Sequence, residues 1–210
     1  MTPPKTPVAT PEASTESPLF LQGWHSHARR VVSPNFGPRP PGTAIDLAIV
    51  HSISLPPGVY GGDEVERLFT NTLDWDAHPY FDQIRGIEVS SHFFIRRDGT
   101  LIQFVSVEDR AWHAGKSSWQ GRDNCNDHSV GIELEGLEHH PFEPPQYEAL
   151  AALLAGLRRA WPIRHVVGHE HVAPGRKEDP GRSFDWPLLA SITGWSSEVL
   201  PPLAVPQRQA

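Results

Sequence analysis

The sequence has little of several features that would place it in particular classes of protein. Only one of its 210 residues is a cysteine, Cys125, so an intramolecular disulfide is excluded and a reducing compartment is permitted. Acidic residues outnumber basic ones by 25 to 18, which gives a formal net charge of -7. A net negative charge repels phosphate backbones, and the sequence has no Lys- or Arg-rich patch that would offset this charge locally. We therefore expect no nucleic acid partner.

Long apolar runs are also missing. No stretch approaches the roughly 20 apolar residues of a membrane span, and residues 1–18 lack the basic start and apolar run of a secretory signal. We therefore expect a soluble, cytoplasmic protein without a membrane partner. Residues 1–18 are rich in Pro, Thr, Ser and Glu, and residues 200–210 are again proline-rich, so both tails are predicted to be disordered. A single domain is predicted between them, at residues 19–199.

Within this domain, patterns typical of strands alternate with patterns typical of helices. Apolar or alternating runs predict strands at Ile45–Val50, His92–Arg97, Thr100–Val105, Ser129–Glu135 and His165–Gly168. The second and third of these are joined by Asp98-Gly99, a tight-hairpin signal. One helix is expected to begin at Asp63, capped together with Glu66, and another to run from Pro144 to Trp161. The predicted fold class is α/β, with a mixed central sheet flanked by helices.

Two histidines follow buried strands at corresponding positions. His51 follows Ile45–Val50, and His169 follows His165–Gly168. Ligand sites of open α/β sheets lie beyond the carboxyl ends of strands, so both could project into one cleft. Asp179 lies ten residues after His169, in a loop long enough to fold back. Two imidazoles and one carboxylate would leave one tetrahedral position open, as at a catalytic zinc. The alternative is that each histidine is an ordinary hydrogen-bonded residue.

Glu133 and Glu135 lie two apart in a predicted strand, so their side chains share a face while Ile132 and Leu134 point into the core. Two carboxylates on one face repel each other unless a cation or solvent is near. The strand is therefore either a solvated edge strand or the carrier of a catalytic carboxylate that accepts a proton from metal-bound water.

Other candidates lie in loops. Lys177 comes two residues before Asp179 and could aim its ammonium group at an oxyanion, although an exposed loop lysine is the simpler interpretation. Trp112 and Trp119 lie in glycine-containing loops, where they could stack on sugar rings or pack in the core. Trp161, on the apolar face of its helix, is predicted to be a core residue.

Four stretches, in this order, resemble a known family: residues 51–58 (HSISLPPG), 110–115 (RAWHAG), 131–136 (GIELEG) and 168–181, which contains GH and APGRKEDPG. They are similar to the N-acetylmuramoyl-L-alanine amidases related to phage lysozyme-type amidases and peptidoglycan-recognition proteins. More narrowly, they resemble AmpD-type 1,6-anhydro-N-acetylmuramyl-L-alanine amidases of cell-wall recycling. The resemblance covers about Gly23 to Trp186.

The resemblance implies a function and a site. The reaction would be zinc-dependent hydrolysis of the amide bond between (1,6-anhydro-)N-acetylmuramic acid and L-alanine in a small muropeptide. One Zn²⁺ would be held by the two histidines and Asp179, Glu133 would act on the water, and Lys177 would stabilise the oxyanion. Candidate substrate-binding residues are Ser52, Trp112 and Arg122, the last through a bidentate contact to a carboxylate.

Three positions depart from the family pattern: Ser52 stands where Asn is usual, His171 where Asp is common, and Glu178 where Thr is common. These departures bear on substrate affinity rather than on metal binding. Three other functions stay open, namely a lytic amidase for intact peptidoglycan, a non-catalytic peptidoglycan-binding module, and a structural protein whose histidines are incidental.

Overall fold

The computed structural model describes residues 18–201 of the chain. The predicted tails, residues 1–18 and 200–210, therefore lie almost wholly outside the described residues, and their disorder stays a prediction. Within residues 18–201, no helix is both long enough and apolar enough to cross a membrane.

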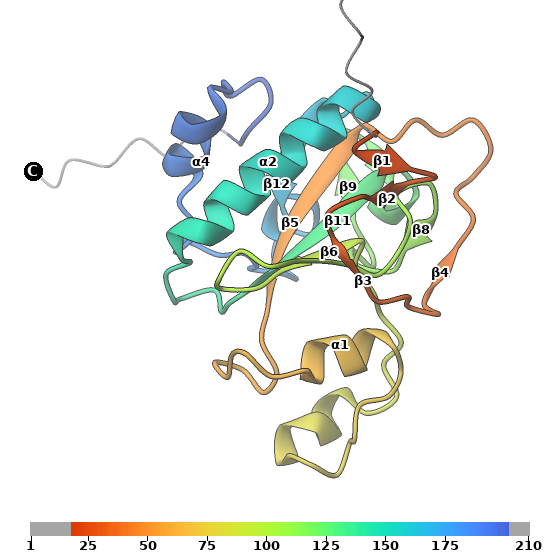
Figure 1. Cartoon of the computed structure of the whole chain (residues 1–210), viewed down its shortest axis with the longest axis vertical. Coiled ribbons are helices and arrows are strands. Elements are labelled where there is room, and N and C mark those ends of the chain that lie inside the picture. The colour runs from red at the N-terminus through yellow and green to blue at the C-terminus, as the bar shows by residue number, and fades with distance from the viewer. Residues whose placement is uncertain (1–17, 202–210) are drawn as a thin grey trace, which may run out of the picture.

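A six-stranded mixed sheet forms the centre of the fold (Figure 1). Its spatial order is β12 (His165–Gly168), β5 (Leu47–Ile53), β11 (Ser129–Glu135), β6 (Phe93–Ile95), β7 (Leu101–Gln103) and β3 (Arg29–Arg30). All neighbouring strands run parallel except β6 and β7, which are antiparallel. The predicted α/β class with a mixed sheet is confirmed.

The strand predicted at Ile45–Val50 lies two to three residues further along the chain, at Leu47–Ile53. His51 therefore lies inside β5, whereas the sequence predicted that it follows the strand. The extension has a physical reason, because β11 pairs with β5 along all seven residues, up to Glu135 opposite Ile53. Backbone pairing with a buried neighbour thus continues the strand past its apolar run.

The predicted hairpin is present with shorter strands than expected. Gly99 adopts a positive φ of 85°, which glycine tolerates without steric penalty, and the Asp98 side chain accepts a hydrogen bond from the Thr100 backbone at 2.8 Å. Together these features close the turn between β6 and β7.

The helix α2 (Pro144–Ala160) covers one face of the sheet, with α4 (Trp186–Thr193) beside it (Figure 1). At its start, the Gln146 side chain accepts a hydrogen bond from the backbone N–H of Glu143 at 3.0 Å, and proline at the first helical position suits the helix start. The predicted apolar face is confirmed, since Tyr147, Leu150, Leu154 and Leu157 are buried in the main core with Ile132 and Leu134, and Trp161 packs against it.

The helix α1 (Glu64–Phe69) and the 3₁₀ helix η1 (Pro79–Ile84) follow β5 and pack into a second apolar cluster. The predicted capping pair of Asp63 and Glu66 is wrong. Asp63 forms an ion pair with Arg67 at 2.8 Å, and Glu66 binds Arg29 and Arg96. Long guanidinium side chains have drawn both carboxylates away from the backbone N–H groups of the first turn.

The remaining elements are short. They are β1 (Phe20–Leu21), β2 (Trp24–His25), β4 (Phe36–Gly37), β8 (Arg110–Ala111), β9 (Ser118–Trp119), β10 (Arg122–Asp123), the 3₁₀ helix η2 (Cys125–Asp127) and α3 (His169–Val172). The free thiol of Cys125 is buried in a third apolar cluster, which also includes Leu47 and Ile49 from the sheet.

Candidate active site

A cavity of about 320 Å³ lies where β5, β11, α3 and the loops near them meet. Most of the side chains that the sequence suggested for chemistry line this cavity: His51, Ser52, Trp112, Glu133, His169, Lys177 and Asp179. Its other wall is largely apolar and comes from the segment around η1, with Tyr80, Ile84, Ile87 and Val89.

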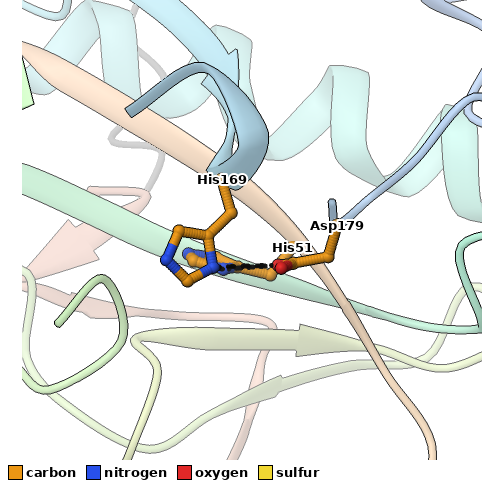
Figure 2. Close-up of side chains that lie close together, drawn as sticks. All are labelled: His51, His169 and Asp179. Atoms are coloured by element: carbon orange, nitrogen blue, oxygen red, sulfur yellow. Dashed lines mark hydrogen bonds and ion pairs between the residues drawn. The ribbon is translucent and has the colours of Figure 1, made fainter. Parts of the chain in front are cut away.

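His51, His169 and Asp179 form a buried cluster of three potential metal ligands. Figure 2 shows the three side chains pointing toward one another from β5, the start of α3 and the loop that follows it. The two Nδ1 atoms lie 3.0 Å apart, and Asp179 Oδ2 lies 3.0 Å from His51 Nδ1 and 3.1 Å from His169 Nδ1. The expectation that these three residues meet is therefore confirmed.

Burial and mutual charge shape the protonation of this cluster. Burial, together with the neighbouring His169, lowers the pKa of His51 to about 4, so its ring is neutral at pH 7. Burial opposes ionisation of Asp179, but hydrogen bonds from the two histidines outweigh it and leave the pKa of the carboxyl below its usual value. At neutral pH the site therefore combines one negative charge with a neutral His51 ring.

Glu133 lies at the edge of the cluster. It is the parallel-strand neighbour of His51, is 8% exposed, and its Oε2 is buried without a hydrogen-bond partner among residues 18–201. Burial, and then the charge of Asp179, raise the pKa of the Glu133 carboxyl well above its ordinary value. A carboxyl with a raised pKa inside a cavity is suited to exchange protons with a substrate or a water.

The interpretation of this strand as a solvated edge is wrong. β11 lies between β5 and β6, and both Glu133 and Glu135 are buried. The carboxylate of Glu135 accepts hydrogen bonds from the backbone N–H groups of Gly61 at 2.6 Å and Arg97 at 3.0 Å. Glu135 thus ties the loop after β5 to the sheet and leaves Glu133 as the carboxyl that faces the cavity.

Lys177 is exposed on the loop that carries Asp179 and lines the cavity from that side. Ser52 and Trp112 also line it, and the Ser52 hydroxyl is buried without a hydrogen-bond partner in the part of the chain that the structure describes. A partnerless hydroxyl in a cavity wall is available to a bound molecule.

Two other residues lie apart from this group. Arg122 is in β10, outside the lining of the cavity, and its guanidinium forms an ion pair with Asp46 at 2.8 Å. The structure therefore does not place it with the expected substrate-binding residues, because an acidic neighbour holds it elsewhere. His171 is outside the ligand cluster, and its Nδ1 accepts a hydrogen bond from the Gly168 backbone.

His113 is a residue of the site to which the sequence gave no role. Its ring stacks edge-on against that of His51, and its Nδ1 lies 3.0 Å from His51 Nε2. The signals in the sequence were its place beside Trp112 and within residues 110–115, one of the stretches that resemble the amidases. Its contact with His51 depends on how the loop after β8 crosses the sheet, which spacing along the chain does not reveal.

A mixed sheet that brings three potential metal ligands, a buried carboxyl and a nearby lysine into one cavity is typical of the class of metal-dependent hydrolases. Comparisons with known proteins then give the family. The profile described as N-acetylmuramoyl-L-alanine amidase matches residues 41–182, and the chain belongs to this amidase family.

Individual relatives agree with this membership. The 1,6-anhydro-N-acetylmuramyl-L-alanine amidase AmpD of Citrobacter freundii is 48% identical over 181 residues, which cover 85% of this chain and 97% of that one. AmpD of Escherichia coli strain K12 is 48% identical over 170 residues, covering 80% and 93%.

Solved structures agree as well. A crystal structure of a selenomethionine AmpD derivative superposes with a TM-score of 0.81 at 48% identity, covering 83% of this chain and 98% of that chain. A complex of the amidase AmiD from E. coli with the substrate anhydro-N-acetylmuramic acid-L-Ala-D-γ-Glu-L-Lys gives a TM-score of 0.51 at 29% identity, covering 73% and 60%.

Proposed function

We propose that this amidase hydrolyses the amide bond between 1,6-anhydro-N-acetylmuramic acid and L-alanine in muropeptides, and that it does so with one bound Zn²⁺. The observation that carries the proposal is the buried cluster of His51, His169 and Asp179 next to Glu133 in a single cavity. The names of the AmpD relatives, which match over nearly their whole length, support the choice of substrate.

The donor set fits a zinc ion. The Nε2 atom of His169 lies 3.1 Å from the Ala114 carbonyl oxygen, which can only accept, so a ring that binds a metal through Nδ1 can keep its proton on Nε2. In that tautomer, Nδ1 of His169 and Oδ2 of Asp179 are two acceptors 3.1 Å apart, and a cation bound by both removes their repulsion. Ligands at tetrahedral positions around zinc lie roughly 3.4 Å apart, close to the separations in this cluster.

When bound at this cluster, zinc would act as a Lewis acid on the amide carbonyl and would lower the pKa of a water molecule. Glu133 would accept the proton of the attacking water at its carboxylate and deliver it to the departing nitrogen of L-alanine. Its buried position keeps that proton away from bulk solvent, and its unpartnered oxygen is available to receive it. Amide cleavage requires this delivery because an amide anion is a poor leaving group.

The remaining lining residues would bind the substrate. Lys177, on the exposed side of the cavity, would place its ammonium group beside the negative charge that develops on the carbonyl oxygen. Trp112 and the apolar wall around Tyr80 and Ile87 offer surfaces for a sugar ring, and Ser52 offers a hydroxyl. Action in the cytoplasm stays a prediction.

The decisive experiment is hydrolysis of purified anhydro-muramyl tripeptide by the recombinant protein, with chelator and with zinc added back. We expect release of free peptide that chelation abolishes and zinc restores. No cleavage by protein that holds one zinc per chain would contradict the proposed reaction. Faster release of peptide from intact sacculi than from the soluble fragment would instead indicate a lytic amidase.

A further inference from the structure

The inner nitrogens of the two histidines face Asp179 (Figure 2), and their outer nitrogens face two consecutive residues of one loop. His51 Nε2 lies 3.0 Å from Nδ1 of the His113 ring. His169 Nε2 lies 3.1 Å from the carbonyl oxygen of Ala114. Two consecutive residues, His113 and Ala114, thus contact both histidines on the side away from the cluster.

These outer contacts determine which nitrogen of each ring is free to bind a metal. The Ala114 carbonyl accepts only, so it can hold a proton on His169 Nε2 while Nδ1 binds a metal. His113 Nδ1 can accept a hydrogen bond from His51 Nε2, and its own Nε2 lies 3.3 Å from the Ser129 hydroxyl. Metal-binding histidines generally depend on such outer partners for their tautomer and their orientation.

A single side chain holds this segment in place. The amide oxygen of Asn126, in η2, accepts hydrogen bonds from the backbone N–H of His113 at 3.2 Å and of Ala114 at 2.8 Å. Asn126 is itself buried, at 6% exposure, and its backbone carbonyl accepts a hydrogen bond from Arg39 at 3.1 Å. Asn126 is therefore fixed from both its side chain and its backbone.

The opposite side of the His113 ring is shaped by a glycine of β11. A Cβ atom added to Gly131 would lie 2.4 Å from His113 Cγ, well inside any real contact distance. The ring therefore occupies space that only glycine leaves free at this position of the strand. The sheet below and Asn126 at the backbone together leave the ring little freedom to move away from His51.

We infer that Asn126 is a positioning residue for the metal site. Its amide oxygen holds the His113–Ala114 segment against the outer nitrogens of His51 and His169. The inference rests on the proposed zinc site. Asn126 does not line the cavity, so it acts through other residues and does not touch the substrate.

The test is zinc affinity, measured on folded metal-free protein by competition with a chromophoric chelator. Asn126→Ala should bind zinc roughly 10- to 100-fold more weakly, the usual effect of losing an outer partner. Asn126→Asp should recover most of this affinity, because a carboxylate oxygen can accept both N–H groups. Ser117→Ala is the matched control, since the Ser117 hydroxyl accepts a hydrogen bond from the Cys125 backbone and donates one to the Gly115 carbonyl. It therefore joins the same two loops without a hydrogen bond to the backbone N–H groups of His113 and Ala114. This control should change the affinity far less.

Cobalt substitution separates positioning from general loss of structure. The visible absorption bands of Co²⁺ report ligand geometry, so Asn126→Ala should shift them and Asn126→Asp should restore them. If Asn126→Ala does not fold, His113→Phe decides the matter. Phenylalanine keeps a ring over Gly131 but cannot accept a hydrogen bond from His51, and a similar loss of zinc affinity is expected.

Wild-type zinc affinity in Asn126→Ala, or in His113→Phe where the first variant does not fold, would overturn the positioning role and leave the zinc proposal standing. Failure of the wild-type protein to bind one zinc ion per chain would overturn both the positioning role and the zinc proposal. The two failures are therefore distinguishable in one series of titrations.

Discussion

Glu133 lies directly opposite His51 in the parallel pairing of β11 with β5, and both side chains face the same cavity. Parallel partners in a sheet point to the same side. Register alone therefore places the buried carboxyl next to the metal-ligand cluster, although 82 positions separate Glu133 from His51 in numbering (133 minus 51). A shift of one residue would turn the carboxyl toward α2 and the apolar core.

Replacement of this carboxyl should separate metal binding from catalysis. Glu133→Gln keeps the size of the side chain and removes its basicity, so turnover of anhydro-muramyl tripeptide should fall by roughly 10²- to 10⁴-fold. Zinc content, measured by atomic absorption, should stay at one per chain. Undiminished turnover would remove Glu133 from the proposed mechanism.

Loss of a ligand should have the opposite signature. Asp179→Ala removes the only carboxylate of the cluster, so both zinc and turnover should be lost, and zinc affinity should fall by more than the roughly 10- to 100-fold effect of an outer partner. Glu178→Ala is the control for zinc binding, because Glu178 is the exposed neighbour of Asp179 outside the cluster. Retention of tightly bound zinc by Asp179→Ala would contradict the ligand assignment.

The lysine at the mouth of the cavity is predicted to act on the transition state. Lys177→Met should lower kcat by roughly 10²- to 10³-fold with little change in KM, the usual effect of losing an oxyanion donor. Zinc content should not change. Lys116→Met, at an exposed lysine outside this cavity, should leave kcat as it is. If KM rises and kcat does not fall, Lys177 binds the substrate and does not stabilise an oxyanion.

Glu135 is predicted to serve stability rather than chemistry. The Glu135 carboxylate accepts hydrogen bonds from the backbone N–H groups of Gly61 and Arg97. In Glu135→Gln, the side-chain NH₂ group would face one of these N–H groups, so one of the two hydrogen bonds would be lost. The free energy of unfolding should fall by about 1.5–3 kcal/mol, the usual value of a hydrogen bond to a charged group. Urea denaturation of the zinc-bound protein measures it. A loss of zinc at unchanged stability would instead place Glu135 at the metal site.

Stability should also depend on pH through His92. Burial, and then the charge of Arg39, lower the pKa of His92 from 6.5 to about 3. Because the folded-state pKa lies below the unfolded one, the folded protein gains its full stabilisation above about pH 6.5. It loses that stabilisation as the pH falls toward about 3.

His92→Gln should therefore reduce the slope of the free energy of unfolding against pH in the metal-free protein. Between about pH 4 and 6.5, the reduction should reach up to about 1.4 kcal/mol per pH unit. Denaturant titrations at several pH values would measure the slope. Equal slopes for variant and wild type would show that His92 does not contribute.

The sequence by itself predicted five of the six strands of the central sheet, the helices α1 and α2, and most of the candidate residues that line the cavity. The apolar runs at Ser129–Glu135 and His165–Gly168 predicted both strands to the residue, and the proline pair at 144 and 145 predicted the start of α2. These features are local, because the periodicity of apolar residues and the signals for a helix start involve residues close together along the chain. The resemblance to the amidases likewise came from short stretches of sequence in a fixed order.

Only the tertiary structure decided which of the singled-out residues meet. It joined His51, His169 and Asp179, and it paired Arg122 with Asp46. It also gave two buried carboxyls different surroundings, since Glu133 lines the cavity and Glu135 binds backbone N–H groups. It also brought the His113 ring to His51, and the side chain of Asn126 to the backbone of His113 and Ala114. These contacts depend on strand register and on loops that cross the sheet. Residues far apart along the chain are placed by backbone pairing and packing, which no local pattern of side chains records.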